Sequence, residues 1–240
     1  MAWGGGFLVN GSGHVHIWAK VAFTASGNAL YATSQACGSS LPSATLILNL
    51  GRILIEIPND TWDLSTMPRF VFKATQSGWN VGSTLNYTYS ALIGVDPTDP
   101  TTDAATPWPD SYAGIAATDP DGDGKPGVTA VPRSGGGFVA PPTMSLLASV
   151  DRVYIVLRNT SSVIKTRTTC DRASGTAELM HFDNHVVGCH VEGGRDCGPA
   201  DVDFVDGNRT AYRATSATIE SVVVPDTATC ADVRAALPIN

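Results

Sequence analysis

The chain has 240 residues, of which 43% are hydrophobic and 15% charged, and its formal net charge is −7. The apolar content is sufficient for a folded core, so composition excludes a wholly disordered chain. The scarcity of Lys and Arg excludes an extended basic surface, and we therefore expect neither nucleic acid nor an anionic membrane as a partner. No apolar stretch approaches the roughly 20 residues that a helix needs to cross a bilayer, so we predict no transmembrane segment.

The first part of the chain carries the alternation that is typical of half-buried strands. Between Gly13 and Ala25 the apolar residues fall on one face, at Val15, Ile17, Ala19, Val21 and Phe23. Similar runs, bounded by Gly, Pro, Asn or Ser, follow at 29–36, 44–57, 69–74 and 81–93. This periodicity predicts a β-meander.

From Gly94 to Arg133 the alternation stops, and Asp, Pro, Thr and Gly predominate. A connection of this length is characteristic of functional or disordered loops. Further strands are expected at 143–150, 152–158, 163–169, 176–182 and 211–224. Two short helices are expected at 200–205 and 230–237, the second capped by Thr229 with Asp232 three residues later.

These patterns predict one all-β domain over residues 1–240, an antiparallel sandwich or barrel with one or two short helices. Two β-rich halves, about 7–95 and 135–225, are joined by the acidic loop 96–133. Glycine runs at 4–6 and 135–137 open both halves, which leaves a distant duplication as an alternative.

Five cysteines are spread along the chain without the C-x-x-C spacing of redox or zinc-ribbon motifs, at Cys37, Cys170, Cys189, Cys197 and Cys230. Disulfides explain this pattern better than metal ligation does. Cys189 and Cys197 flank a turn-rich segment, so we predict a bridge between them and leave the other pairings open. Disulfides indicate a secreted, periplasmic or cell-surface protein, whereas five reduced thiols in a cytosolic protein are the alternative.

The strongest chemical signal lies inside the long loop, where Asp119, Asp121 and Asp123 alternate with Pro and Gly. The spacing D-x-D-x-D-G brings three carboxylates together while glycine allows a sharp turn, and Ca²⁺ takes about six to eight such oxygen ligands. The carbonyl of Lys125, at the seventh position, is a further candidate ligand. Weaker candidates lie in the preceding acidic segment, at Asp96, Asp99, Asp103 and Asp110.

The loop is not an EF-hand, because its twelfth position is Ala130 instead of a bidentate Glu and neither flank has a helical pattern. It resembles the aspartate and glycine calcium loops of thrombospondin type 3 repeats, which bind calcium without EF helices. The segment 119–129, the pair of cysteines at 189 and 197 and the segment 222–225 together resemble uncharacterised secreted β-rich proteins of myxobacteria-type bacteria. That resemblance implies export and a shared loop, and it implies no activity.

A zinc site is an alternative at a second cluster, formed by His181, His185, Cys189 and His190. In a helix, the first three of these would share one face, and a strand pair at His14 and His16 could add ligands. The neighbouring residues favour strand and turn, with a bend at Asp183 and Asn184. A disulfide at Cys189 would also remove its thiolate.

No serine nucleophile is signalled, since the chain lacks a G-x-S-x-G elbow. Paired carboxylates for a hydrolase are available in principle, at Glu56, Glu178, Glu192 and Glu220, but one sequence does not show which lie close together. Catalysis is therefore left uncertain, with binding favoured.

Five tryptophans fill the core or provide platforms for a glycan or small apolar ligand, at Trp3, Trp18, Trp62, Trp79 and Trp108. The sequence predicts a calcium-binding, secreted β protein that acts as a binding or structural module. Its partner would be a small molecule, a glycan or a surface protein. A secreted hydrolase with an acidic or zinc-dependent site is the alternative.

Overall fold

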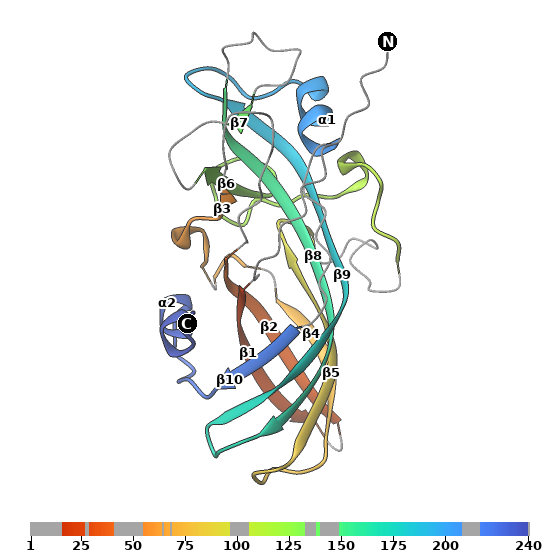
Figure 1. Ribbon diagram of the computed structural model, residues 1–240, viewed down its shortest axis with the longest axis vertical. Coiled ribbons are helices and arrows are strands. Elements are labelled where there is room, and N and C mark those ends of the chain that lie inside the picture. The colour runs from red at the N-terminus through yellow and green to blue at the C-terminus, as the bar shows by residue number, and fades with distance from the viewer. Residues whose placement is uncertain are drawn as a thin grey trace.

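The strands of the protein form an antiparallel sheet that curls around a long axis (Figure 1). The computed structural model describes residues 16–26, 29–40, 55–63, 65–67, 69–96, 106–132, 138–139, 149–207 and 217–239. The strands among these residues are β1 (His16–Ser26), β2 (Ala29–Ser40), β3 (Ile55–Glu56), β4 (Phe70–Gln76), β5 (Thr84–Ile93), β6 (Val128–Pro132), β7 (Phe138–Val139), β8 (Ser149–Arg167), β9 (Arg172–Val191) and β10 (Ala217–Val222). The all-β prediction is confirmed.

The strand order makes β8 the spine of the sheet. On one side, β1, β2, β4 and β5 follow in sequence, and β5 pairs with the second half of β8. Beyond the end of β5, β6 pairs with the same edge of β8, and β3 pairs with β6. On the other side, β9 follows β8 along nearly its full length, and β10 pairs with β9. One sheet therefore joins both parts of the chain.

The inner face of the sheet carries the alternating apolar residues that the sequence predicted for its strands. In β8, Val153, Ile155 and Leu157 belong to the largest core cluster, and Val163 belongs to a second cluster with Leu30. The opposite face of β8 is also covered, because Val156 packs with residues of the segment 95–117 in a third cluster. Both faces of the central strand are thus buried, so the long loop is part of the packing.

Two expected strands, 152–158 and 163–169, are in fact the single strand β8, and this prediction was wrong. The polar residues between the two expected strands were assigned to neither of them, but Asn159, Thr160 and Ser161 are buried strand residues. Their polar atoms are paired inside the sheet: Ser161 Oγ donates to Asn159 Oδ1 at 3.0 Å, and the hydroxyls of Thr160 and Ser90 lie 2.9 Å apart. Mutual hydrogen bonding lets these residues remain in a buried strand.

The bend expected at Asp183 and Asn184 is also absent, since both residues lie within β9. The carboxylate of Asp183 is held by Arg158 on the neighbouring strand, with Nη2 and Oδ2 2.8 Å apart. The segment 94–133 is not wholly irregular either: it contains a 3₁₀ turn at Tyr112–Gly114 and ends in β6. The expected strand at 44–57 lies outside the described residues except for its last three, and the glycine runs lie wholly outside them.

The two expected helices are confirmed as α1 (Pro199–Gly207) and α2 (Cys230–Ala236). α2 begins in the capping box that the sequence predicted: the backbone N–H of Asp232 donates to the Thr229 hydroxyl at 3.3 Å, and Thr229 N–H donates to the Asp232 carboxylate at 2.8 Å. These bonds satisfy amide groups that a helix leaves free at its start. The Thr229 N–H and hydroxyl, which both donate to the Asp232 carboxylate, lower the pKa of Asp232 because they stabilise its charged form.

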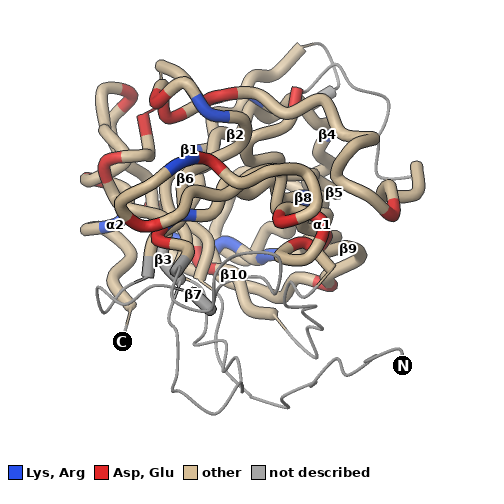
Figure 2. The backbone as a smooth tube through the Cα atoms, turned by 90° about the horizontal axis from the view of Figure 1, so that it is seen from above, with Lys and Arg blue, Asp and Glu red and all other residues tan. Residues whose placement is uncertain are grey.

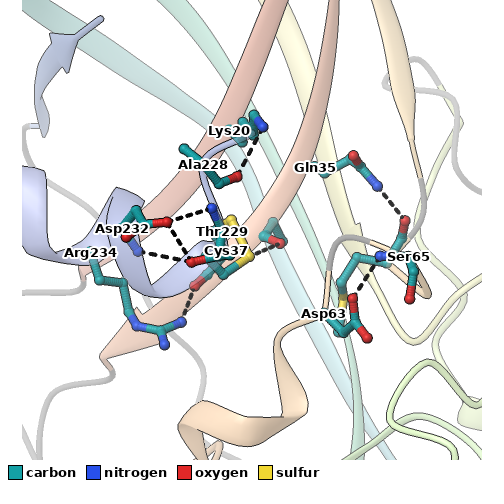
Figure 3. Close-up of a disulfide and its surroundings, with 12 residues drawn as sticks. Lys20, Gln35, Cys37, Asp63, Ser65, Ala228, Thr229, Asp232 and Arg234 are labelled. Carbon is teal, nitrogen blue, oxygen red and sulfur yellow. Dashed lines mark hydrogen bonds between the residues drawn. A yellow bond between two sulfur atoms is a disulfide. The ribbon is translucent and has the colours of Figure 1, made fainter. Parts of the chain in front are cut away.

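The C-terminal segment is attached to β1 and β2, as Figure 3 shows. A disulfide joins Cys37 of β2 to Cys230 of α2. The Arg234 guanidinium donates to the Cys37 carbonyl at 2.6 Å, and the Lys20 amine donates to the Ala228 carbonyl at 2.9 Å. At the far end, Trp18 Nε1 donates to the carbonyl of Leu237 at 2.8 Å. The final helix is therefore bound to the first hairpin by one covalent bond and several polar contacts.

Candidate metal site

The Asp/Gly loop at 119–124 wraps around the first of its aspartates. Asp119 accepts hydrogen bonds from the backbone N–H of Gly122 and of Gly124, both at 2.8 Å. Both glycines adopt positive φ angles, 71° and 79°, a conformation that side chains with a Cβ adopt at a steric cost. The two glycines therefore allow the backbone to turn tightly enough for three carboxylates to converge.

Asp119, Asp121 and Asp123 each offer a carboxylate oxygen, and these oxygens lie within 4.8 Å of one another. Thr129, on β6, fixes the other two carboxylates: its N–H donates to Asp121 Oδ2 at 2.8 Å, and its hydroxyl donates to Asp123 Oδ2 at 2.5 Å. The cluster is thus attached to the sheet by one residue of a strand. This is the group of acidic side chains, among the described residues, that could hold a metal ion.

Asp121 is the least solvated member of the cluster. Its Oδ1 is buried and has no hydrogen-bond partner in the protein. Burial raises the pKa of Asp121, and the nearby charge of Asp123 raises it further. A carboxylate in this position is destabilised as an anion unless a cation or proton is added, so the residues present fit a metal ion that prefers oxygen ligands.

Lys125 connects the loop to the segment around the second disulfide. Its backbone N–H donates to Asp123 Oδ1 at 2.9 Å, and its amine lies 2.6 Å from Asp196 Oδ2. This hydrogen bond lowers the pKa of Asp196. Asp196 also accepts from the Tyr154 hydroxyl at 3.3 Å, and burial, with the charge of Asp196, raises the pKa of Tyr154 to about 12. The predicted ligand role of the Lys125 carbonyl stays a prediction.

The weaker acidic candidates do not join the cluster. Asp96 and Asp110 are described, but neither contributes to the group of three. Asp99 and Asp103 lie outside the described residues. The acidic segment before the loop therefore supplies no additional carboxylate from its described part.

The predicted Cys189–Cys197 disulfide is present, and it closes the turn after β9. Cys189 is therefore not a thiolate ligand. The segment that would have placed His181, His185 and Cys189 on one helical face is a strand, so the geometry of the zinc alternative is not formed. Cys170 is exposed and unpaired at the hairpin between β8 and β9, and it accounts for the fifth cysteine.

His185 instead belongs to a buried polar network that the sequence did not reveal. Its side chain is fully buried, and Nδ1 lies 2.8 Å from Asp206 Oδ2 on α1. Nε2 lies 2.8 Å from the carbonyl oxygen of Pro109. The Val186 N–H donates to the same carboxylate at 2.8 Å. The network joins β9, α1 and the long loop, and its partners are 20 or more residues apart in sequence.

Trp108 lies against two side chains of this region, His185 and Arg158. Its ring stacks on His185, with centroids 6.0 Å apart, and the Arg158 guanidinium lies 5.0 Å from its centroid. Arg158 also donates to the Thr106 carbonyl at 2.8 Å. Trp108 therefore packs the segment after Thr106 against the sheet. Of the two roles predicted for the tryptophans, packing and ligand stacking, it has the first.

The remaining tryptophans and glutamates are dispersed. Trp62 is buried in the core and Trp79 is 60% exposed, while Trp3 lies outside the described residues. Glu178, Glu192 and Glu220 are exposed on β9, in the turn after it and on β10. Figure 2 shows acidic residues on many elements, with the fewer basic residues scattered among them.

A small apolar cavity of about 20 Å³ lies between β1, β2, β5, β8 and β9. Its lining includes Ala19, Ala91 and Phe182. Pockets that hold drug-sized ligands have volumes of roughly 300–1,000 Å³. This cavity therefore has room for a molecule of about the size of water.

Comparison with known proteins gives no match: neither a family model, nor a curated protein, nor a solved structure is similar to this chain. Neither helix of the described chain has the length and hydropathy to cross a membrane.

Proposed function

We propose that the protein is a secreted calcium-binding β protein that acts as a binding or structural module, with the ion held by Asp119, Asp121 and Asp123. The observation that supports this most directly is the Asp121 carboxylate. Its Oδ1 is buried beside two other carboxylates and has no partner in the protein. A cation at this point would offset both the repulsion between the carboxylates and the desolvation of Asp121.

Calcium suits the donor set better than zinc or magnesium. Zn²⁺ in proteins is usually held by His and Cys, and the cluster offers oxygen ligands alone. Mg²⁺ demands a near-ideal octahedron, whereas Ca²⁺ accepts irregular sets of six to eight oxygens. The Lys125 carbonyl and water would complete such a set. Two disulfides support an oxidising compartment for the protein.

The proposed role of the ion is to brace β6 against the spine of the sheet. Thr129 connects two of the carboxylates to β6, where its neighbours Val128 and Ala130 are fully buried. Without a cation, repulsion between the carboxylates acts on this strand directly. Binding of calcium should therefore stabilise the folded chain, since the unfolded chain lacks the assembled site.

Calorimetric titration of chelator-treated protein with CaCl₂ tests the proposal. We expect the titration to show one Ca²⁺ per chain and weaker binding of Mg²⁺. In chemical denaturation, calcium at 100 times its dissociation constant should increase the free energy of unfolding by about 2.7 kcal/mol. Asp121→Asn should weaken calcium binding at least about tenfold, because it removes one ligand charge. Glu220→Gln is the matched control, since it removes an exposed carboxylate from β10.

The proposal fails if millimolar CaCl₂ leaves the unfolding midpoint unchanged, or if Asp121→Asn and Glu220→Gln bind calcium equally well. Export is tested separately, by quantifying free thiols in protein that is purified under denaturing conditions from its native source. One free thiol per chain is expected, and five would refute an oxidising compartment.

A further inference from the structure

Lys165 places an amine on the inner face of the curled sheet, remote in sequence from the aspartate loop. It follows Val163 on β8, where two positions along a strand share a face, and Val163 is fully buried. Lys165 itself is only 6% exposed. A lysine amine in such a position is unusual, because lysine is rarely buried without a pairing group.

The surroundings of the amine are aromatic and hydroxylic. Its Nζ lies 5.6 Å from the ring centroid of Phe23 and 5.4 Å from that of Tyr87, and it donates to Ser221 Oγ at 2.8 Å. No carboxylate of the described chain is paired with it in an ion pair or shifts its pKa. Burial alone lowers the pKa of Lys165 to about 8. Near neutral pH, a larger fraction of this amine than of an exposed lysine is therefore uncharged and nucleophilic.

Phe23 is the exposed member of this group of residues. Its side chain is 40% exposed, and its ring centroid lies 5.6 Å from the Lys165 amine. Aromatic rings beside the amine favour an uncharged, apolar reactant over a charged one. The four groups form a cluster that brings a nucleophile, a hydroxyl and an apolar contact surface to one place.

We propose that Lys165 is an attachment site for small neutral aldehydes of apolar or aromatic character, which it binds reversibly as an imine. The Nζ lone pair forms a bond to the carbonyl carbon, and the π electrons of the carbonyl move to its oxygen. That oxygen takes a proton from the nitrogen, which gives a carbinolamine. Transfer of the second nitrogen proton and cleavage of the C–O bond release water and leave the C=N bond, so no oxidant or reductant is consumed.

Ser221 is placed to assist the proton transfers. Its hydroxyl lies within hydrogen-bond distance of Nζ, and a hydroxyl both accepts and donates protons. Ser221 is on β10, so the site is complete only when the last strand is paired with β9. The inference is independent of the proposed calcium function, because none of its groups belongs to the aspartate cluster.

Reductive trapping tests the inference on the whole protein. The protein is incubated at pH 8 with benzaldehyde and sodium cyanoborohydride, and benzylated lysines are quantified by peptide mass spectrometry. Lys73, exposed on β4, is the internal control. At pH 8, about 0.4% of an ordinary exposed lysine is uncharged, whereas about half of an amine with a pKa near 8 is uncharged. We therefore expect Lys165 to be benzylated ~10-fold faster than Lys73, even though access to Lys165 is restricted.

Two outcomes overturn the inference: equal or slower modification of Lys165 than of Lys73, or modification of Lys165 only in denaturant. Lys165→Arg keeps a cation in place and should abolish the fast phase while the rate at Lys73 stays unchanged. Glyoxylate, an anionic aldehyde, should show a smaller preference for Lys165 than benzaldehyde does. The faster benzylation of Lys165 should persist in excess chelator, which shows that this site does not depend on the proposed calcium site.

Discussion

Replacing Lys165 by methionine should stabilise the protein, and the gain should disappear as the pH rises. The pKa of this amine falls from 10.5 to about 8 on folding because of burial. At about 1.4 kcal/mol per pKa unit, keeping the amine charged in the folded state costs about 3 kcal/mol. Its hydrogen bond to Ser221 and its contacts with two rings are lost in the variant, which offsets about 1 kcal/mol. The expected gain at pH 7 is therefore about 2 kcal/mol.

The pH dependence follows from proton binding. Between pH 8 and pH 10.5 the unfolded chain holds its Lys165 proton while the folded chain has released it, so the free energy of unfolding of the natural protein rises with pH in this window. The advantage of Lys165→Met is fully present below pH 8 and shrinks above it.

Urea unfolding of both proteins at pH 7, 8, 9 and 10 measures the difference. Lys73→Met is the matched control, because Lys73 is exposed on β4 and its replacement should change the free energy of unfolding by less than about 0.5 kcal/mol at every pH. A variant that is less stable than the natural protein at pH 7, or a difference that does not change between pH 7 and pH 10, would refute the reasoning.

The two disulfides should contribute differently to the free energy of unfolding. On loop-closure entropy alone, replacing both cysteines of Cys37–Cys230 by alanine costs about 5 kcal/mol, because their sequence separation is 193. The same replacement at Cys189–Cys197 costs about 2.5 kcal/mol, because their separation is 8. Chemical denaturation measures both, and the reverse order would contradict the entropy argument. His185→Ala should cost about 1–3 kcal/mol, because the buried Asp206 carboxylate loses its hydrogen bond to the imidazole while it keeps the one to the Val186 N–H. His190→Ala breaks a contact of equal length, 2.8 Å, in a more exposed place and should cost less than about 1 kcal/mol, so equal losses in thermal melts would show that burial is not decisive.

The features that the sequence predicted correctly are those whose determinants are local. The aspartate cluster was predictable because its three carboxylates lie within five residues, and Gly122 and Gly124 allow the turn. The start of α2 was predictable for the same reason, because Thr229 and Asp232 are three residues apart. The short Cys189–Cys197 disulfide belongs to this class as well.

Features that depend on distant partners were missed or mispredicted. The polar run after Arg158 was left out of the expected strands, because nothing in its own sequence shows that Ser90 would pair with Thr160 across the sheet. His185 was considered as a metal ligand, and its actual partner, Asp206, lies on a helix 21 residues later. Lys165 had a usable signal: strand alternation from Val163 places it on the buried face, and a charged residue there conflicts with its neighbours.

The Cys37–Cys230 disulfide closes the chain between these two residues into a covalent ring. Among the described residues, the ring contains every strand after β2, the aspartate loop and α1. A protease that cuts the backbone once anywhere inside the ring leaves both pieces joined through the disulfide. In an extracellular setting, a single cleavage would therefore leave the molecular mass almost unchanged under non-reducing conditions. The sheet would keep all the strands that it had before the cut.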